Sequence, residues 1–413
     1  MYKIPKILIT SEFQFGCKKK ISCSHALFAF KETIIKHLED KMKIYAAKLD
    51  AVKAFDKLWR EGLYYKMKKK KFDMSIIMLL RIYYDLLASF IKLDKKLSKR
   101  IKLKRGVKQG GVISGILFNF FLDDLLTLCS ESGFGATFFE IIQCIFGFCD
   151  DICLLSQIIE ELQQLLLICE SYANKWAIEF NISKCQIMMF GTKKQLIENR
   201  AQFFLNGKEI EYTDNFKYLG LEFTYNLDMA SFFIKKFQNV SKSFYSLNSF
   251  GFKCGGVDPF LQAFIYKSFC LSRILYGLEI MTLNKITLQK LNISQNNIIR
   301  YFTGLSRNSH ITTLTKILKL FNIHDLYYYM KLVLIKNLKN NTICSRIFDY
   351  LLISNYKSNT MSFIKDFDTI CYSLDLDEDY IIKNTNQVLL KFKQNTRDIC
   401  SYDSCEAEII KTC

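Results

Sequence analysis

Two adjacent aspartates, Asp150 and Asp151, interrupt an otherwise apolar stretch in residues 147–155. Apolar residues lead into the pair and out of it, and this pattern predicts two buried strands joined by a tight turn. Adjacent carboxylates at such a turn repel each other and lose hydration, so the fold must offset that cost. A divalent cation does so most directly, because Mg²⁺ and Mn²⁺ prefer hard oxygen ligands. Taken alone, the pair fits a polar turn without any metal equally well.

A third aspartate in a similar setting favours the metal interpretation. A short β-prone stretch begins at Ile44 and ends at Asp50, and a helix-prone stretch follows Lys57. Strand ends that bring carboxylates to one point are typical of two-metal phosphoryl-transfer sites. Helix capping and a solvated turn are the alternative roles for Asp50 and Asp56.

Three segments, in this order, resemble the motifs of one enzyme family. Residues 49–59 (LDAVKAFDKLW) resemble the first palm motif of reverse transcriptases of non-LTR (LINE-like) retrotransposons. Residues 105–119 are similar to the family's RGVRQG…LS…LFN motif, and residues 148–151 (FCDD) to its aromatic-x-Asp-Asp motif. Three matches in the family's order are far more specific than any one of them.

Further segments extend the resemblance over residues 12–305, about three quarters of the chain. The segments QFGCKK and SCSHAL, in residues 14–27, resemble the fingers pattern QFGFR…ST.HA. Residues 180–188 resemble FN..KT..M, and residues 275–279 and 291–304 are similar to the family's thumb region. The FKYLG segment resembles the primer grip, which implies primer binding by Phe216, Lys217, Tyr218, Leu219 and Gly220.

The resemblance implies a metal site and a catalytic lysine. Asp50 and Asp150 would hold two Mg²⁺ ions, which Mn²⁺ could replace, with Asp151 as a weaker ligand and the backbone carbonyl of Ala51 completing the coordination. Lys184 stands where the family has a lysine that protonates or neutralises the departing pyrophosphate. A solvated surface lysine is the alternative for this position.

The resemblance also implies nucleotide-binding residues. Phe55 would be the steric gate that excludes a 2′-hydroxyl, although ordinary core packing is the alternative role for a phenylalanine. Gln109 and Gly110 would contact the template–nucleotide pair, or form a simple turn. Lys18 stands where the family more often has Arg; it would neutralise the triphosphate without a bidentate fork.

Several positions depart from the family pattern. Cys149 replaces the usual Ala, Gly111-Val112 replaces Cys/Ser-Pro, and Ser114-Gly115 replaces Ser-Pro. The lost prolines loosen a loop that should hold the base pair, but the metal ligands are untouched. A catalytically inactive, truncated nucleic-acid-binding remnant of an element is therefore the alternative function.

Composition agrees with a nucleic-acid partner. The chain has 58 Lys and Arg against 40 Asp and Glu, a net charge of +18, which favours polyanions. No run of about 20 apolar residues predicts a membrane span. Fifteen cysteines and four histidines lack the spacing of a zinc site, so we expect no zinc and mostly reduced thiols. An intracellular protein is expected, in the nucleus or a cytoplasmic ribonucleoprotein.

The expected architecture is α+β, a right-hand polymerase palm with partial fingers and a helical thumb. Amphipathic helices are predicted over residues 159–176 and after Ser114, with Ser114 as N-cap and Leu117, Phe121, Leu125 and Leu128 on the apolar face. The expected regions are partial fingers (1–45), palm (46–225), helical thumb (226–305) and a helical C-terminal extension (306–413). The implied reaction is Mg²⁺-dependent addition of deoxynucleoside triphosphates to a DNA primer on an RNA template. Because no endonuclease domain is recognisable, the chain is expected to be part of a longer element protein.

Overall fold

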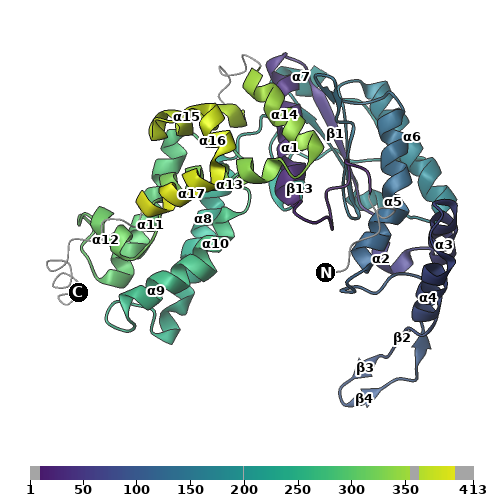
Figure 1. Cartoon of the computed structure of the whole chain (residues 1–413), viewed down its shortest axis with the longest axis horizontal. Helices are drawn as coiled ribbons and strands as arrows, with labels where there is room; N and C mark the ends of the chain where they lie inside the picture. Colours follow the sequence, from purple (N-terminus) through teal and green to yellow (C-terminus); the bar gives the residue numbers. More distant parts are fainter. Residues whose placement is uncertain (1–9, 199, 354–361, 396–413) are drawn as a thin grey trace. The chain divides into compact units, whose positions relative to one another are not determined.

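The computed structural model describes residues 10–198, 200–353 and 362–395. The chain divides into two units, of which the first extends to Gly220 and the second begins at Leu221, with Asn341–Ile343 grouped with the first (Figure 1). The first unit combines helices with a four-stranded sheet, whereas the second is mainly helical. The expected mixture of helices and strands is thus confirmed.

A four-stranded antiparallel sheet forms the centre of the first unit, with the strand order β10–β1–β9–β8. Strand β1 (Ile44–Leu49) pairs with β9 (Asp151–Ser156) on one side and with β10 (Gln186–Phe190) on the other. Strand β8 (Ile145–Phe148) and β9 form the predicted hairpin, and Cys149 and Asp150 lie between them. The apolar pattern on both sides of the aspartate pair therefore predicted the element type correctly.

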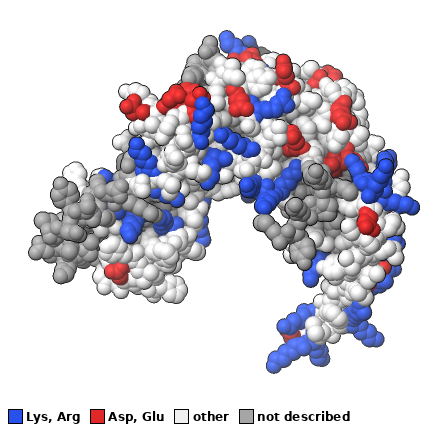
Figure 2. All heavy atoms as spheres, viewed as in Figure 1, with Lys and Arg blue, Asp and Glu red and all other residues white. Residues whose placement is uncertain are grey.

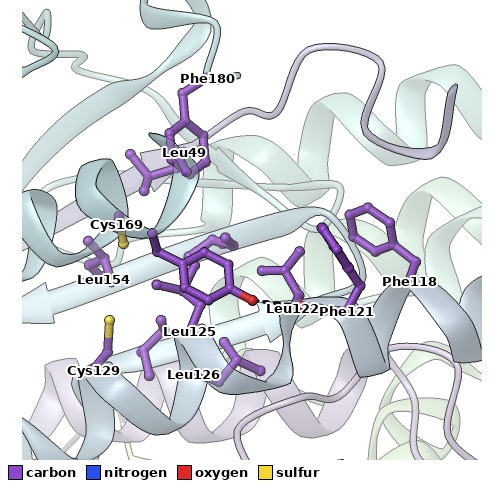
Figure 3. Close-up of a cluster of buried hydrophobic side chains, with 14 of the residues drawn as sticks. Leu49, Phe118, Phe121, Leu122, Leu125, Leu126, Cys129, Leu154, Cys169 and Phe180 are labelled. Carbon is purple, nitrogen blue, oxygen red and sulfur yellow. Dashed lines mark hydrogen bonds between the residues drawn. The ribbon is translucent and has the colours of Figure 1, made fainter. Parts of the chain in front are cut away.

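Helices cover both faces of this sheet. On one face, Phe30 of α1 (Cys23–Glu39) packs edge-on against Phe146 and Phe190, at centroid distances of 5.8 and 6.2 Å. On the other face, Leu49 and Leu154 belong to a buried core with residues of α5 (Ser114–Glu131) and α6 (Ile159–Trp176) (Figure 3). The sheet is buried on both faces, so its strand ends are fixed in position.

The two predicted helices are present, with one correction. Helix α6 spans the predicted residues 159–176. In α5 the N-cap is Ile113, so Ser114 is the first helical residue, and its hydroxyl donates to the carbonyl of Lys108 at 2.6 Å. Leu128 is 50% exposed and therefore does not belong to the buried face that Leu117, Phe121 and Leu125 form.

The basic run of residues 66–71 is not uniformly solvated. Lys66 lies in α3 (Arg60–Lys69) and is buried, with its Nζ over the Trp176 ring, 4.0 Å from the ring centroid. Its ammonium group pairs with Asp124 at 3.1 Å and donates to the carbonyl of Phe121 at 2.7 Å. Burial lowers the pKa of Lys66 to about 8, and Asp124 opposes that shift.

Shorter elements complete the first unit. The small two-stranded pairs are β2–β5, β3–β4, β6–β7 and β11–β12. Their bounds, with those of the remaining helices, are α2 (Ala54–Lys57), α4 (Met74–Asp85), β2 (Ala88–Ser89), β3 (Lys92–Leu93), β4 (Lys96–Leu97), β5 (Ile101–Lys102), β6 (Thr137–Phe138), β7 (Ile141–Ile142), η2 (Ile182–Lys184), α7 (Lys193–Glu198), β11 (Phe204–Leu205), β12 (Lys208–Glu209) and β13 (Phe216–Tyr218).

The second unit is a helical assembly around α8, α11 and α13. Aromatic residues on one face of α8 are buried, and the buried Lys331 of α13 pairs with Asp366 of α15 at 2.9 Å. No described helix of the chain is long and apolar enough to cross a membrane. The elements are β14 (Leu221–Phe223), α8 (Ala230–Tyr245), η3 (Ser246–Phe250), α9 (Pro259–Ile265), η4 (Tyr266–Leu271), α10 (Ser272–Leu275), α11 (Lys285–Thr303), α12 (Thr312–Ile317), α13 (Ile323–Leu338), α14 (Thr342–Ile353), α15 (Phe363–Leu374), α16 (Glu378–Lys383) and α17 (Thr385–Asn395).

Candidate active site

Three aspartates lie near one another at one end of the central sheet. The β1–β9 register ends with Leu49 opposite Ile152, so Asp50, the next residue, comes beside Asp151. Asp150 lies at the turn between β8 and β9 and is half-buried. Burial raises the pKa of Asp150, and the nearby Asp151 and Asp50 raise it further, because each adds negative charge. Both causes disfavour the ionised form of Asp150, so its negative charge is only partly compensated in this setting.

Two lysines face these carboxylates. Nζ of Lys184 is 3.9 Å from Oδ2 of Asp50, and the Lys184 side chain is largely exposed. Nζ of Lys48 is 3.6 Å from Oδ1 of Asp151 and donates to the backbone carbonyl of Lys217 at 3.3 Å. The sequence analysis identified Lys184 but missed Lys48. Strand alternation could have found it, because residues two apart on β1 lie on one face and Lys48 is two residues before Asp50.

The oxygen-rich donor set suits a hard divalent cation. Carboxylates at a turn whose negative charge is only partly compensated are the ligands that Mg²⁺ prefers. In the described part of the chain, no three side chains of metal-binding type are grouped closely enough to enclose an ion by themselves. Mg²⁺ is commonly held by one or two carboxylates together with substrate phosphates and water, so an open donor set fits such an ion.

Phe55 lies in the short helix α2 that follows β1, and Gln109 and Gly110 lie on the loop that precedes α5. The half-buried ring of Phe55 stacks on Phe118 with centroids 4.7 Å apart. Nε2 of Gln109 donates to Asp56 of α2 at 3.2 Å, which connects this loop to α2. Gly110 has a φ of +73°, so this turn needs the left-handed backbone that glycine adopts without strain. A Cβ placed there would meet open space.

The structure does not bring Lys18 to the aspartates. Its ammonium group donates to the backbone carbonyls of Thr10 and Ser11, at 3.0 and 2.5 Å. Burial lowers the pKa of Lys18 to about 8, and Asp123 and Glu12 oppose the shift. This lysine holds the segment before α1 in the present conformation.

The FKYLG segment lies beside α1 in the first unit. Phe216 stacks on Phe30 at 6.1 Å and Tyr218 lies 5.0 Å from the same ring, while Lys217 between them is exposed. The chain then turns through Leu219 and Gly220, whose φ angles are +43° and +80°. The Lys217 backbone carbonyl accepts a hydrogen bond from the Lys48 ammonium group.

The Gln14 side chain holds the backbone of the aspartate turn by a hydrogen bond, a role that the sequence analysis did not assign. Its side-chain oxygen accepts hydrogen bonds from the backbone N–H groups of Gly16 and Cys149, both at 2.9 Å. Gln14 is fully buried, and its backbone bridges to Gly147. Only its place in the QFG segment could have indicated a function from sequence.

A polymerase-like site on a mixed helix-and-sheet fold agrees with the comparisons with known proteins. Residues 3–223, more than half of the chain, match the family model described as reverse transcriptase (RNA-dependent DNA polymerase). The chain therefore belongs to the reverse transcriptase family and has a polymerase fold. Curated relatives of the chain are polymerases of non-LTR retrotransposons, the group that the sequence motifs resemble.

Two relatives and one solved structure illustrate the similarity. The RNA-directed DNA polymerase from mobile element jockey of Drosophila melanogaster is 24% identical over 311 residues, 71% of this chain and 32% of that protein. The Pol polyprotein of retrotransposable element R2DM, also of Drosophila melanogaster, is 32% identical over 187 residues, 44% of this chain and 18% of the relative. The chain thus spans a third or less of either relative. Telomerase from Candida albicans, solved with a fragment of telomeric RNA, aligns with 91% of this chain and 54% of its own at 13% identity, with a TM-score of 0.40.

Proposed function

We propose that this chain is the RNA-directed DNA polymerase of a non-LTR retrotransposon. It joins the 3′-hydroxyl of a DNA primer to the α-phosphate of a deoxynucleoside triphosphate, copied from an RNA template. The observation that carries the proposal is the register of β1 with β9, which sets Asp50 beside the Asp150–Asp151 turn. Family membership over residues 3–223 supports it.

Asp50, Asp150 and Asp151 would hold two divalent cations, Mg²⁺ or Mn²⁺, with the carbonyl of Ala51 as a further ligand. When bound, these ions lower the pKa of the primer hydroxyl and brace the triphosphate. The chain's own residues orient the reactants. Lys184, close to Asp50, is within reach of charge that develops on the leaving pyrophosphate.

Phe55, Gln109 and Gly110 would form the nucleotide pocket. The Phe55 ring is supported by Phe118, so it is held rigid enough to exclude a 2′-hydroxyl. Gln109 is oriented by Asp56, and Gly110 leaves space for a base pair to approach the backbone. The segment Phe216–Gly220 would hold the primer strand, and Lys18 would stabilise the fingers segment rather than contact the triphosphate.

A basic surface supports the nucleic-acid partners. Exposed Lys and Arg side chains gather on the β3–β4 hairpin and its flanks (Figure 2), namely Lys92, Lys95, Lys96, Lys99, Arg100 and Lys102. Such a cluster contributes salt-dependent phosphate contacts without sequence preference. RNA template and DNA primer are the polyanions that the proposed reaction requires.

The proposed regions are partial fingers up to residue 45, a palm over 46–225, a helical thumb over 226–305 and a helical extension beyond it. The division of the chain at Gly220 supports a palm that ends close to the FKYLG segment. The predominance of helices after Leu221 supports the thumb assignment.

Primer extension on an RNA template with Mg²⁺ tests the proposal. The expected result is extension by the unmodified chain and loss of at least 100-fold, an order-of-magnitude figure, in Asp50→Ala and Asp150→Ala with little change in duplex affinity. Asp379→Ala is the matched control, because that aspartate is exposed on α16 of the second unit. Duplex binding without any extension by the unmodified chain would instead support the inactive remnant.

A further inference from the structure

Two cysteine thiols touch at the aspartate turn. Sγ of Cys17 lies 3.1 Å from Sγ of Cys149, although the residues are 132 positions apart in the chain. Cys149 immediately precedes Asp150, and Cys17 follows the segment that pairs with β8. A disulfide bond is roughly 2.05 Å long, so a sulfur displacement of about 1 Å would close it.

Backbone hydrogen bonds hold the two cysteines in this position. The N–H of Phe15 donates to the carbonyl of Gly147 at 2.7 Å, and the N–H of Gly147 donates to the carbonyl of Phe13 at 2.8 Å. The Gln14 side chain binds the N–H groups of both Gly16 and Cys149. Because residues 13–15 are hydrogen-bonded to β8 next to the sulfurs, the thiol contact is part of the fold.

Two glycines make room for the sulfur pair. A Cβ at Gly16 would lie 2.6 Å from Sγ of Cys149, and a Cβ at Gly115 would lie 2.4 Å from Sγ of Cys17. In the family motifs that this sequence resembles, Phe, Ala and Pro stand where this chain has Cys17, Cys149 and Gly115. Cys17 therefore lies against both of the other departures, and a side chain at position 115 would press on its thiol.

Exposure distinguishes this pair from the other closely spaced thiols. Cys17 is exposed, so a small oxidant in solvent can reach it, while Cys149 is 8% exposed directly behind it. Cys129 of α5 and Cys169 of α6 also lie near each other, but both are fully buried in the core. Susceptibility to oxidation follows exposure, so Cys17 is the thiol of these four that reacts first.

We propose that Cys17 and Cys149 form a reversible disulfide when the chain meets a peroxide. Hydrogen peroxide oxidises Cys17 to a sulfenic acid and releases one water; the sulfur of Cys149 then displaces the hydroxyl group, which leaves as a second water with the Cys149 proton. Two thiols lose two electrons, and the peroxide is reduced to two waters. A dithiol such as dithiothreitol reverses the reaction by exchange.

The bond would tie the aspartate turn covalently to the segment before α1. Asp150 follows Cys149 directly, so its carboxylate would lose freedom to adjust when nucleotide and primer bind. The disulfide itself does not depend on the proposed polymerase function, whereas its inhibitory effect rests on that function.

Peptide mapping of the full chain tests the disulfide without an activity assay. After treatment with hydrogen peroxide, alkylation and proteolysis, the expected product is a linked Cys17–Cys149 peptide lighter by two hydrogen atoms than the reduced pair. Cys17→Ser abolishes it, and Cys254→Ser, which removes another exposed thiol, leaves it unchanged. Alkylated Cys17 and Cys149 after oxidation, or Cys17 linked to a different cysteine, overturns the proposal.

Primer extension then tests the consequence. Oxidation should reduce extension by the unmodified chain at least tenfold, an order-of-magnitude expectation, with recovery in dithiothreitol, and should leave Cys17→Ser active. A linked peptide with undiminished extension overturns the inhibitory role. A reduced chain that never extends primers refutes the proposed function instead, while the linked peptide still decides the disulfide.

Discussion

The ammonium group of Lys48 joins two parts of the active-site region, because it lies 3.6 Å from the Asp151 carboxylate and donates to the Lys217 carbonyl. Both side chains of the ion pair are partly exposed, at 20% and 39%, so the pair contributes little to stability. Its effect is positional. The turn that carries Asp150 and Asp151 and the FKYLG segment are held at a fixed spacing by one side chain.

Lys48→Met should impair this spacing. We expect roughly tenfold lower primer extension with a rise in the KM for primer, since misplacement of a bound strand affects alignment more than folding. Lys48→Arg, which retains the charge and can reach the same carbonyl, is the matched control and should recover most of the activity. Extension by Lys48→Met at the rate of the unmodified chain would show that the contact has no functional role.

Lys66 should make stability depend on pH in the alkaline range. Burial lowers its pKa from 10.5 to about 8, so between these values the unfolded state binds more protons than the folded state. The contribution of Lys66 to the free energy of unfolding therefore rises as pH increases from about 8 to about 10.5 and is flat below pH 8.

Urea titrations at pH 7.5 and pH 10 measure this effect. Lys66→Met should show a smaller gain in unfolding free energy between the two pH values than the unmodified chain. Lys69→Met, an exposed lysine on the same helix, serves as control and should retain the full gain. Lys18 and Lys236, whose pKa values are also lowered to about 8 by burial, add to this dependence, whereas buried cysteines such as Cys144 and Cys153, whose pKa values are raised by burial, oppose it. An equal gain in unfolding free energy in Lys66→Met and in the unmodified chain would contradict the lowered pKa of Lys66.

Phe55→Ala should relax sugar selectivity. Removing a ring that stacks on Phe118 opens the space that a ribose 2′-hydroxyl would need. The ratio of ribonucleotide to deoxynucleotide incorporation is expected to rise roughly tenfold or more, because a steric clash is removed. Phe55→Tyr keeps the ring and should retain selectivity. Unchanged selectivity in Phe55→Ala would remove Phe55 from the nucleotide pocket.

Gly115→Ala should destabilise the chain, although Ala is the better helix former at an ordinary helical position. Its Cβ would lie 2.4 Å from Sγ of Cys17, so the cost depends on that sulfur. In a Cys17→Ala background the same substitution should cost roughly 1 to 2 kcal/mol less. Thermal or urea unfolding of the two single variants and the double variant measures the coupling, and strict additivity would argue against the contact.

Local sequence patterns predicted helices and strands, whereas tertiary contacts determined which polar side chains are buried. The apolar period of residues 159–176 gave helix α6, and the apolar flanks of Asp150–Asp151 gave the β8–β9 hairpin, because both signals lie within one segment. Lys66 belongs to the basic run of residues 66–71, whose polarity gives no sign of burial, yet it is buried because α3 packs against α5 and its ammonium group lies over the Trp176 ring.

Contacts between distant segments could not be predicted from composition or from the spacing of apolar residues. Lys48 became a site residue only through the register of β1 with β9. Lys18 was expected near a triphosphate, but its ammonium group is held by two carbonyls that precede it in the chain. The Cys17–Cys149 contact likewise depends on strand pairing across 132 positions.

Strand β1 receives its two neighbours late in the sequence, from residues 151–156 and 186–190. During synthesis from the N-terminus, the strand that leads to Asp50 must therefore wait for more than a hundred further residues before either of its edges is paired. Such long-range closure slows folding and leaves apolar strand edges open to association with other chains. A nascent chain that stalls before Gln186 would expose one edge of β1 and become a substrate for chaperones or aggregation.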